Sequence, residues 1–199
     1  MQNDFFQELK SFFQRFPGIG PRQASRFVYS LTDFNENDRK KMGELISSLD
    51  RYLARCQNCS RIFLLGANSR EFCGFCSENS RRDKSKIMVV EKDSDLLNFE
   101  KTGVHGGVYF VLGGLLDPLD GNSVPKNRIE ILKNNTKKAS EIILALPSTK
   151  LGDFTCEYIK KTVPSSFIKI TRLAKGLSSG VELEYADEST LKHAFENRK

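Results

Sequence analysis

Apolar residues recur every three or four positions through the first third of the chain, which is the spacing of amphipathic helices. The first predicted helix ends at Pro17, and its apolar stripe consists of Phe5, Phe6, Leu9, Phe12, Phe13 and Phe16. We expect this stripe to form a core or subunit contact, with a base-stacking platform as the alternative. A second helix is predicted to begin at Pro21, and a third to cover about 38–53. Their inward-facing positions are predicted to be Ala24, Phe27, Val28 and Leu31, then Met42, Leu45, Ile46, Leu49 and Leu53.

Short, continuous apolar runs alternate with more polar segments in the second half of the chain. The runs cover residues 87–90, 108–112, 141–146 and 167–170. Such runs are typical of parallel strands buried on both faces, and helices are predicted between them, including one over 125–138. The tail is predicted to form a strand over 180–185 and a helix from about Glu188. The predicted fold class is therefore α+β in several parts, with a helical N-terminus, an α/β domain built on a parallel sheet, and a C-terminal strand and helix.

Two Cys-x-x-Cys pairs stand between the helical and the α/β parts. Cys56 and Cys59 are separated by thirteen residues from Cys73 and Cys76. Four thiolates at this spacing suit one tetrahedral Zn²⁺ per chain, and a site closed by four sulfurs is structural and not catalytic. The alternative is a set of free or disulfide-bonded cysteines. We call each Cys-x-x-Cys pair a knuckle, and residues 62–65 and 71–72 are predicted to pair as a hairpin between the two knuckles. Nearby arginines are expected to offset the negative charge of four thiolates on one Zn²⁺; they are Arg55, Arg61, Arg70, Arg81 and Arg82.

The composition fits a soluble globular protein of 199 residues with a formal net charge of +6. The positive excess lies mostly in residues 1–86, which is compatible with a polyanionic partner. No apolar run approaches the roughly 20 residues of a membrane helix, and the N-terminus does not resemble a signal peptide. Only Cys156 remains outside the two pairs, which favours a reducing cytoplasm. No P-loop sequence is present.

The segment between the first two predicted helices resembles a helix-hairpin-helix module. Gly18 and Gly20 permit a tight turn, and Pro21 suits the first position of the next helix. In that module the backbone N–H groups of the hairpin and of the helix N-terminus meet a phosphate without reading bases. Arg22 and Arg26, four residues apart, share one face of the second helix. The alternative is an ordinary corner between two helices.

Taken in order, the motifs resemble the bacterial recombination mediator family RecR over essentially the full chain. They are the hairpin, the Cys₄ knuckle, Val89-Val90-Glu91, the 109–112 strand leading to Pro-Leu-Asp-Gly at 118–121, and an Ala-Lys-Gly then Gly-Val-Glu-Leu-Glu tail. The resemblance implies four parts: a DNA-binding and dimerisation region over 1–54, a zinc finger over 55–79, a Toprim domain over 80–175 and a tail over 176–199. It assigns DNA contacts to Gly18, Gly20, Arg22 and Arg26, zinc ligation to Cys56, Cys59, Cys73 and Cys76, and the Toprim glutamate to Glu91.

The same resemblance implies a partner set and a place in the cell. It implies a ring-like homodimer or homotetramer that encloses single- or double-stranded DNA without sequence preference. It also implies action with RecO and RecF in loading RecA on gaps coated by SSB, in the cytoplasm and at the nucleoid, with no membrane.

Two classes of function remain open, a non-catalytic DNA clamp and a Toprim-type nuclease or primase-like enzyme. In the enzyme, Glu91 would act as general acid/base beside a Mg²⁺ held by a second acidic cluster. The loop after residue 146 offers one acid, Asp153, and Leu151 stands where family members carry another. The clamp is therefore favoured, and Glu91 and Asp153 are expected to contact partner proteins. His105 and His193 are expected at the surface.

Overall fold

The computed structural model describes residues 2–66, 71–119, 124–136, 139–163, 168–174, 177, 180 and 182–196. These residues divide into two compact units, Met1–Tyr52 and Leu53–Lys199. Within the described residues, no helix is both long enough and apolar enough to cross a bilayer.

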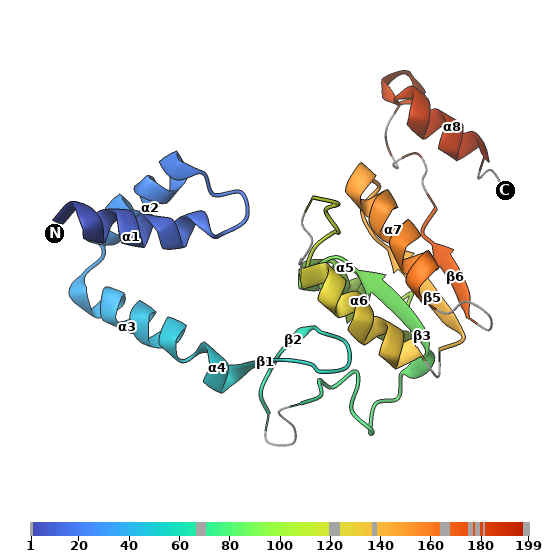
Figure 1. Ribbon diagram of the computed structural model, residues 1–199, viewed down its shortest axis with the longest axis horizontal. Helices are drawn as coiled ribbons and strands as arrows, with labels where there is room; N and C mark the ends of the chain where they lie inside the picture. The colour runs from blue at the N-terminus through green and yellow to red at the C-terminus, as the bar shows by residue number, and fades with distance from the viewer. Residues whose placement is uncertain are drawn as a thin grey trace. The chain divides into compact units, whose positions relative to one another are not determined.

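The first unit is entirely helical (Figure 1). It consists of α1 (Gln2–Gln14), α2 (Pro21–Asp33), α3 (Glu36–Ser47) and α4 (Leu49–Tyr52). Aromatic rings hold α1 against α2, with ring centroids 5.3 Å apart for Phe6 and Tyr29 and 5.5 Å apart for Phe13 and Phe27. Asn35 caps α3 by accepting from the Asp38 N–H, so this helix begins two residues before its predicted start.

The apolar residues of α3 are exposed, and the prediction that they face inward is wrong. Ala24 and Val28 of α2 are buried, whereas Leu45, Ile46 and Leu49 are about half exposed. Periodicity identifies an apolar face, but it does not say whether this unit supplies the surface that covers the face.

The second unit begins with a small antiparallel sheet of β1 (Leu53–Arg55) and β2 (Ile62–Leu64). This pairing replaces the hairpin predicted between residues 62–65 and 71–72. Leu53, predicted to end the third helix, begins β1 instead, because the first knuckle reverses the chain and brings β2 back beside residues 53–55. Of the predicted connecting turn, residues 67 and 68 lie outside the described part of the chain.

A four-stranded parallel sheet follows, which confirms the predicted α/β domain. Its order is β4-β3-β5-β6. The strands are β3 (Asp83–Val90), β4 (Gly107–Val111), β5 (Glu141–Ala145) and β6 (Lys169–Arg172), and the crossover helices are α5 (Asp93–Thr102), α6 (Val124–Asn135) and α7 (Lys150–Thr162). We call residues 83–172 the sheet domain.

Two layers of helix cover the sheet, as Figure 1 shows with α6 and α7 on one face. That face is packed with buried residues of β3, β4, β5, α6 and α7, including Phe110, Ile129 and Ile159. The other face packs Met88, Val90 and Tyr109 against Leu96 of α5 and against Phe75 of the zinc knuckle. Burial on both faces explains why the central strands are continuous apolar runs.

The tail contains α8 (Glu188–Glu196), as predicted, but no strand among its described residues. Leu183–Tyr185 forms a 3₁₀ turn where the strand was expected, and Val181 lies outside the described residues.

Candidate functional site

Four cysteines converge at the start of the second unit. The sulfurs of Cys56, Cys59, Cys73 and Cys76 all lie within 4.8 Å of one another, and three of these residues are buried. The Sγ atoms of Cys59 and Cys73 are 3.5 Å apart, so no disulfide joins them. The sequence prediction that the two knuckles meet is confirmed, and the resulting cage is compatible with a metal ion.

Hydrogen bonds among the four thiols shift their pKa values in opposite directions. Hydrogen bonds from Cys59, then from Cys73 and Cys76, lower the pKa of Cys56, because S–H groups pointed at its sulfur stabilise the thiolate. The bond to Cys56 in turn raises the pKa of Cys59, which acts as the donor. Soft thiolate donors in a compact tetrad suit Zn²⁺, and no fifth side chain is needed to complete four-coordination.

Backbone geometry shapes the first knuckle. Ser60 is buried and adopts a left-handed conformation with φ of +60°, where its N–H donates to the Cys56 carbonyl at 2.9 Å. Arg55 secures the same turn, because its Nη1 donates to the Ser60 carbonyl at 2.7 Å. Arg55 therefore has a structural contact beyond the charge compensation predicted from its position.

Three hydrogen bonds fix the knuckle to the sheet domain. The Cys59 carbonyl accepts from the Val111 N–H at 2.9 Å, on the edge strand β4. Asn135 of α6 donates through Nδ2 to the Asn58 carbonyl at 2.7 Å. Asp93, the first residue of α5, accepts from the Ile62 N–H at 2.8 Å. The cap of α5 is completed by Asp95, which accepts from the Lys92 N–H.

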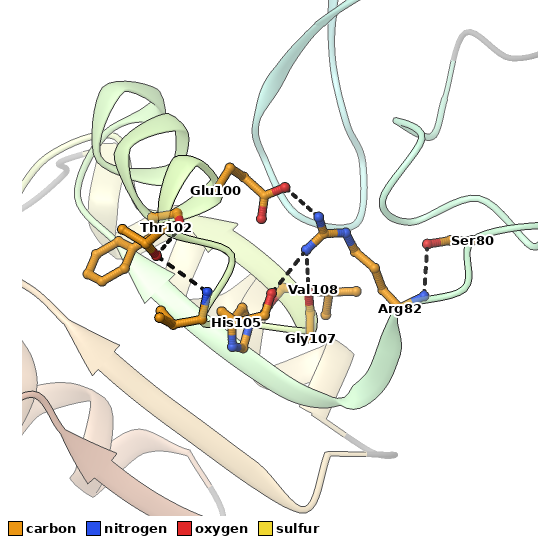
Figure 2. A network of polar contacts seen from close by, with 9 residues as sticks. Ser80, Arg82, Glu100, Thr102, His105, Gly107 and Val108 are labelled. Atoms are coloured by element: carbon orange, nitrogen blue, oxygen red, sulfur yellow. Dashed lines mark hydrogen bonds and ion pairs between the residues drawn. The ribbon is translucent and has the colours of Figure 1, made fainter.

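Arg82 joins the second knuckle to the sheet domain. Figure 2 shows its contacts with Glu100 and Gly107. Its Nη2 forms an ion pair with Glu100 of α5, and its Nη1 donates to the Gly107 carbonyl at 3.0 Å. The guanidinium also lies 4.0 Å from the centre of the Phe75 ring, between the second pair of cysteines. One cation thus contacts the knuckle, β4 and α5 together.

His105 is buried beside this network, so its predicted surface position is wrong. Its Nε2 lies 3.1 Å from the Val108 carbonyl, and because a carbonyl only accepts, this nitrogen carries the proton. The ring meets Tyr109 edge-on at 4.9 Å. Burial raises the pKa of the Tyr109 hydroxyl. The side chain of His193 lies outside the described residues.

Replacing Arg82 with alanine is expected to destabilise the second unit by about 2–3 kcal/mol. The side chains of Arg82 and Glu100 are only 23% and 24% exposed. The substitution therefore leaves the partly buried Glu100 carboxylate without its cation and removes the cation–π contact with Phe75. Lys160→Ala is the control, because it breaks the exposed Lys160–Glu157 pair and should cost less than about 0.5 kcal/mol. Urea denaturation followed by circular dichroism compares them. Equal midpoints for the two variants would contradict the role given to Arg82.

The turn of the candidate hairpin lies between α1 and α2. Gly18 has φ of +77°, a conformation that L side chains rarely adopt. Gly20 precedes α2 in an extended conformation with φ of −80°, and a Cβ there would meet no atom within 4 Å. The fold therefore requires glycine at position 18 but does not require it at position 20.

The first turn of α2 carries N–H groups that no capping side chain satisfies. Gly20 occupies the cap position without a side-chain bond, Pro21 follows it, and the first intrahelical bond runs from Ala24 to Gly20. Groups of this kind bind anions. Arg22 and Arg26 are exposed on the same helix, and neither forms an ion pair within the described residues.

Glu91 and Asp153, at the carboxyl edge of the sheet, each have a basic neighbour. Glu91 follows β3, is 13% exposed and forms an ion pair with Lys92 at 3.0 Å. Asp153 lies in the first turn of α7 and pairs with Arg172 of β6 at 2.5 Å. Leu151 is 42% exposed. Among the residues that the structure describes, only the four cysteines form a group of three or more potential metal ligands.

Comparison with known proteins identifies the family of this chain. The family model for the Toprim domain matches residues 85–174, and the model for the RecR C-terminal region matches residues 176–199. A protein named recombination protein RecR from Lactobacillus helveticus is 38% identical over 189 residues, covering 94% of this chain and 92% of that protein. The chain belongs to the RecR family of recombination proteins.

Other RecR proteins show the same full-length likeness. The one from Staphylococcus aureus is 38% identical over 196 residues, covering 96% of this chain and 94% of its own. The one from Chlamydia abortus is 34% identical over 197 residues, covering 98% and 96%. The sheet domain is therefore a Toprim domain, and Glu91 directly follows its strand β3.

Several residues that build the RecR knuckle were not predicted from the sequence. Phe75 and Asn135 connect it to the Toprim domain, and Asn135 does so across 77 residues of chain. Arg61 and Arg82 were predicted only as charge compensation, yet both stack on the Phe75 ring. The aromatic residue inside a Cys-x-x-Cys knuckle followed by arginines was the available signal. Arg70 lies outside the described residues.

Proposed function

We propose that the protein is a recombination mediator in DNA repair, a non-catalytic DNA clamp that acts with RecO and RecF to load RecA on SSB-coated single-stranded gaps. The observation that carries this proposal is the likeness to RecR proteins along almost the whole chain. Because the likeness covers 94% and 98% of this chain, the clamp and its partner contacts are proposed for the matched length and not for the Toprim domain alone.

In this proposal the hairpin contacts DNA without reading its sequence. The uncapped N–H groups before Ala24 and the cations Arg22 and Arg26 provide fixed and mobile donors to phosphate oxygens. Gly18 shapes the turn, and Gly20 keeps a side chain away from the approaching backbone of the DNA. Because these contacts are made to phosphate oxygens, they can bind single-stranded and double-stranded DNA alike.

The four cysteines are proposed to bind one structural Zn²⁺ per chain. The compact all-sulfur cage and its three hydrogen bonds to the Toprim domain support a role in stability. The ion would hold the two knuckles together, and the protein residues would provide all other contacts.

We further propose that the chain forms a ring-like homodimer or homotetramer. The N-terminal unit supports this, because apolar side chains of α1 and α3 remain exposed, among them Phe5, Leu45 and Ile46. Exposed apolar side chains at this density are typical of surfaces that another subunit covers. The cytoplasm, at the nucleoid, is the proposed location.

Glu91 and Asp153 are proposed to contact partner proteins and not to perform chemistry. Each already has a cationic neighbour, Lys92 and Arg172 respectively. A Mg²⁺ site for phosphoryl transfer needs several oxygen ligands in near-octahedral geometry, and these ion pairs compete for the two carboxylates.

Incubation with DNA tests the non-catalytic part of this proposal. Supercoiled, linear and single-stranded DNA are incubated with wild type and Glu91→Ala in Mg²⁺ or Mn²⁺. We expect binding without nicking, relaxation or primer synthesis by either protein. Product formation that is lost in Glu91→Ala would place the protein among Toprim enzymes.

A further inference from the structure

Helix α2 carries two exposed cations and one exposed aromatic residue on a single face. At about 100° per residue, Arg22, Arg26 and Tyr29 fall within a sector of about 60° around the helix axis. The buried residues Ala24 and Val28 lie on the opposite side of the helix. Tyr29 is 62% exposed, so this face combines positive charge with an accessible aromatic ring.

The Tyr29 ring is held in place by the first helix. Its centroid lies 5.3 Å from that of Phe6 in α1, with the two ring planes tilted by 38°. Phe6 is itself partly buried, whereas Tyr29 is exposed. A ring that is already restrained loses little conformational freedom when a ligand stacks on its exposed surface.

Other exposed aromatic residues of α1 are engaged differently. Phe12 and Phe16 line an apolar groove between α1 and α3. The guanidinium of Arg15 lies 4.7 Å from the centre of the Phe12 ring. Helix α2 contributes Leu31 to the groove, on the side of the helix away from Tyr29. The apolar groove and the Tyr29 ring therefore lie on different sides of α2.

We propose that Tyr29 stacks on an unpaired base of single-stranded DNA while Arg22 and Arg26 bind phosphates of the same strand. Tyr29 is three residues beyond Arg26, about 4.5 Å along the helix axis, so a short stretch of strand can contact both side chains. The inference rests on the proposed DNA contact of the hairpin, and it makes that contact selective for single strands.

The chemistry of this face suits a single strand of any sequence. Stacking on an aromatic side chain tolerates every base, because each base has a π-face, but it requires a base that is not already stacked within a duplex. A tyrosine presents its ring for stacking and keeps its hydroxyl in water. Asp33 ends α2 on the same face, and its negative charge keeps the phosphates near the start of the helix.

The test compares the affinity of the full-length protein for a labelled single-stranded oligonucleotide and for the duplex of the same sequence, measured by anisotropy. Tyr29→Ala should weaken single-strand binding by about 5- to 150-fold, which corresponds to the loss of one stacked base. Duplex binding should weaken by less than about 2-fold, because phosphate contacts are unchanged. The slope of log K against log salt should stay within about 0.3 of wild type, because no charge is removed.

Three further variants separate stacking from folding. Tyr29→Phe keeps the ring and should retain single-strand affinity within about 2-fold. Tyr29→Leu keeps an apolar contact with Phe6 but has no π-face, so it should bind single strands as weakly as Tyr29→Ala. Tyr52→Ala is the matched control, because Tyr52 is 63% exposed in the same unit. It should change neither affinity by more than about 2-fold.

Tyrosine fluorescence reports stacking directly. The chain contains five tyrosines and no tryptophan, so tyrosine emission is not masked. Addition of an unlabelled single-stranded oligonucleotide should quench the emission of one of the five tyrosines, because its ring stacks on a base. Tyr29→Phe should lose this quenching while it still binds the strand.

The outcomes distinguish this inference from the proposed function. Unchanged single-strand affinity in Tyr29→Ala and Tyr29→Leu, or equal weakening on single strands and duplex, overturns the stacking contact but leaves DNA binding by the hairpin intact. If both variants fail to fold, the quenching decides, and its persistence in Tyr29→Phe overturns the contact. Absence of wild-type binding overturns both the inference and the proposed function. Unchanged affinity with a loss of self-association in sedimentation would assign Tyr29 to a subunit contact and contradict base stacking.

Discussion

Replacing Cys73 with alanine is expected to remove the bound metal and unfold the zinc knuckle. Without a fourth sulfur the tetrahedral site is incomplete, and metal binding and folding of such a segment share one free energy, about 10–16 kcal/mol for isolated zinc fingers. Loss of the knuckle would also release the Cys59–Val111 bond and the Phe75–Arg82 contact. Metal analysis should give one Zn²⁺ per wild-type chain and well under half an equivalent for the variant, with a lower urea midpoint.

Cys156→Ala provides the matched control. Cys156 is as buried as Cys73 but lies in the core of the Toprim domain, where burial raises the pKa of its thiol. The control should retain one equivalent of zinc and lose only the modest stability expected for a small cavity. The structural-zinc account is wrong if wild type contains little zinc, or if Cys73→Ala unfolds at the wild-type midpoint.

Replacing Arg22 and Arg26 together should weaken DNA binding by about 25-fold at 0.1 M salt. Two phosphate contacts contribute about 1.4 to the slope of log K against log salt on single strands. With binding at 1 M salt unchanged, this corresponds to about 25-fold at 0.1 M, and the effect should be the same for every base sequence. Both side chains are exposed and unpaired within the described residues, so the fold should persist. Anisotropy titrations with three unrelated oligonucleotides over a salt series measure both quantities.

Lys10→Ala with Lys41→Ala controls for the loss of charge within the same unit. These lysines lie on α1 and α3, outside the turn at 15–20 and the first turn of α2 in the sequence, and their removal should change affinity by less than about 3-fold through general electrostatics. Equal weakening in the two double variants, or a loss confined to one oligonucleotide, would contradict a sequence-independent hairpin contact.

The elements of the Toprim domain could be predicted because each central strand meets apolar side chains on both faces. The runs at Ile87–Val90 and Val108–Val111 therefore contain no polar alternation. The cysteine tetrad was equally predictable, because its four cysteines lie in two local pairs at fixed spacing in the sequence. Local pattern and local chemistry were sufficient in both cases.

The remaining features depend on contacts between distant parts of the chain. The pairing of β1 with β2 arises from reversal at Ser60, a serine in a left-handed conformation that propensity does not predict. The burial of His105 depends on Val108 and Tyr109. The exposure of Leu45 and Ile46 was not predictable from periodicity, since the same pattern describes a core face and a subunit contact.

The partner contacts of Glu91 and Asp153 stay predictions. Their neighbours Lys92 and Arg172 could not be assigned from the sequence, because Arg172 reaches Asp153 only after α7 and β6 have packed together.

The most direct measurement of the proposed function is the rate of RecA assembly on gapped DNA coated with SSB. The protein is added with its RecO partner, and RecA loading is followed through RecA-dependent ATP hydrolysis. We expect a several-fold acceleration that requires both proteins and that is lost in the Arg22→Ala, Arg26→Ala variant but retained in the Lys10→Ala, Lys41→Ala control. No acceleration by the wild-type pair, under conditions where RecA loads readily on bare single-stranded DNA, would contradict the mediator function.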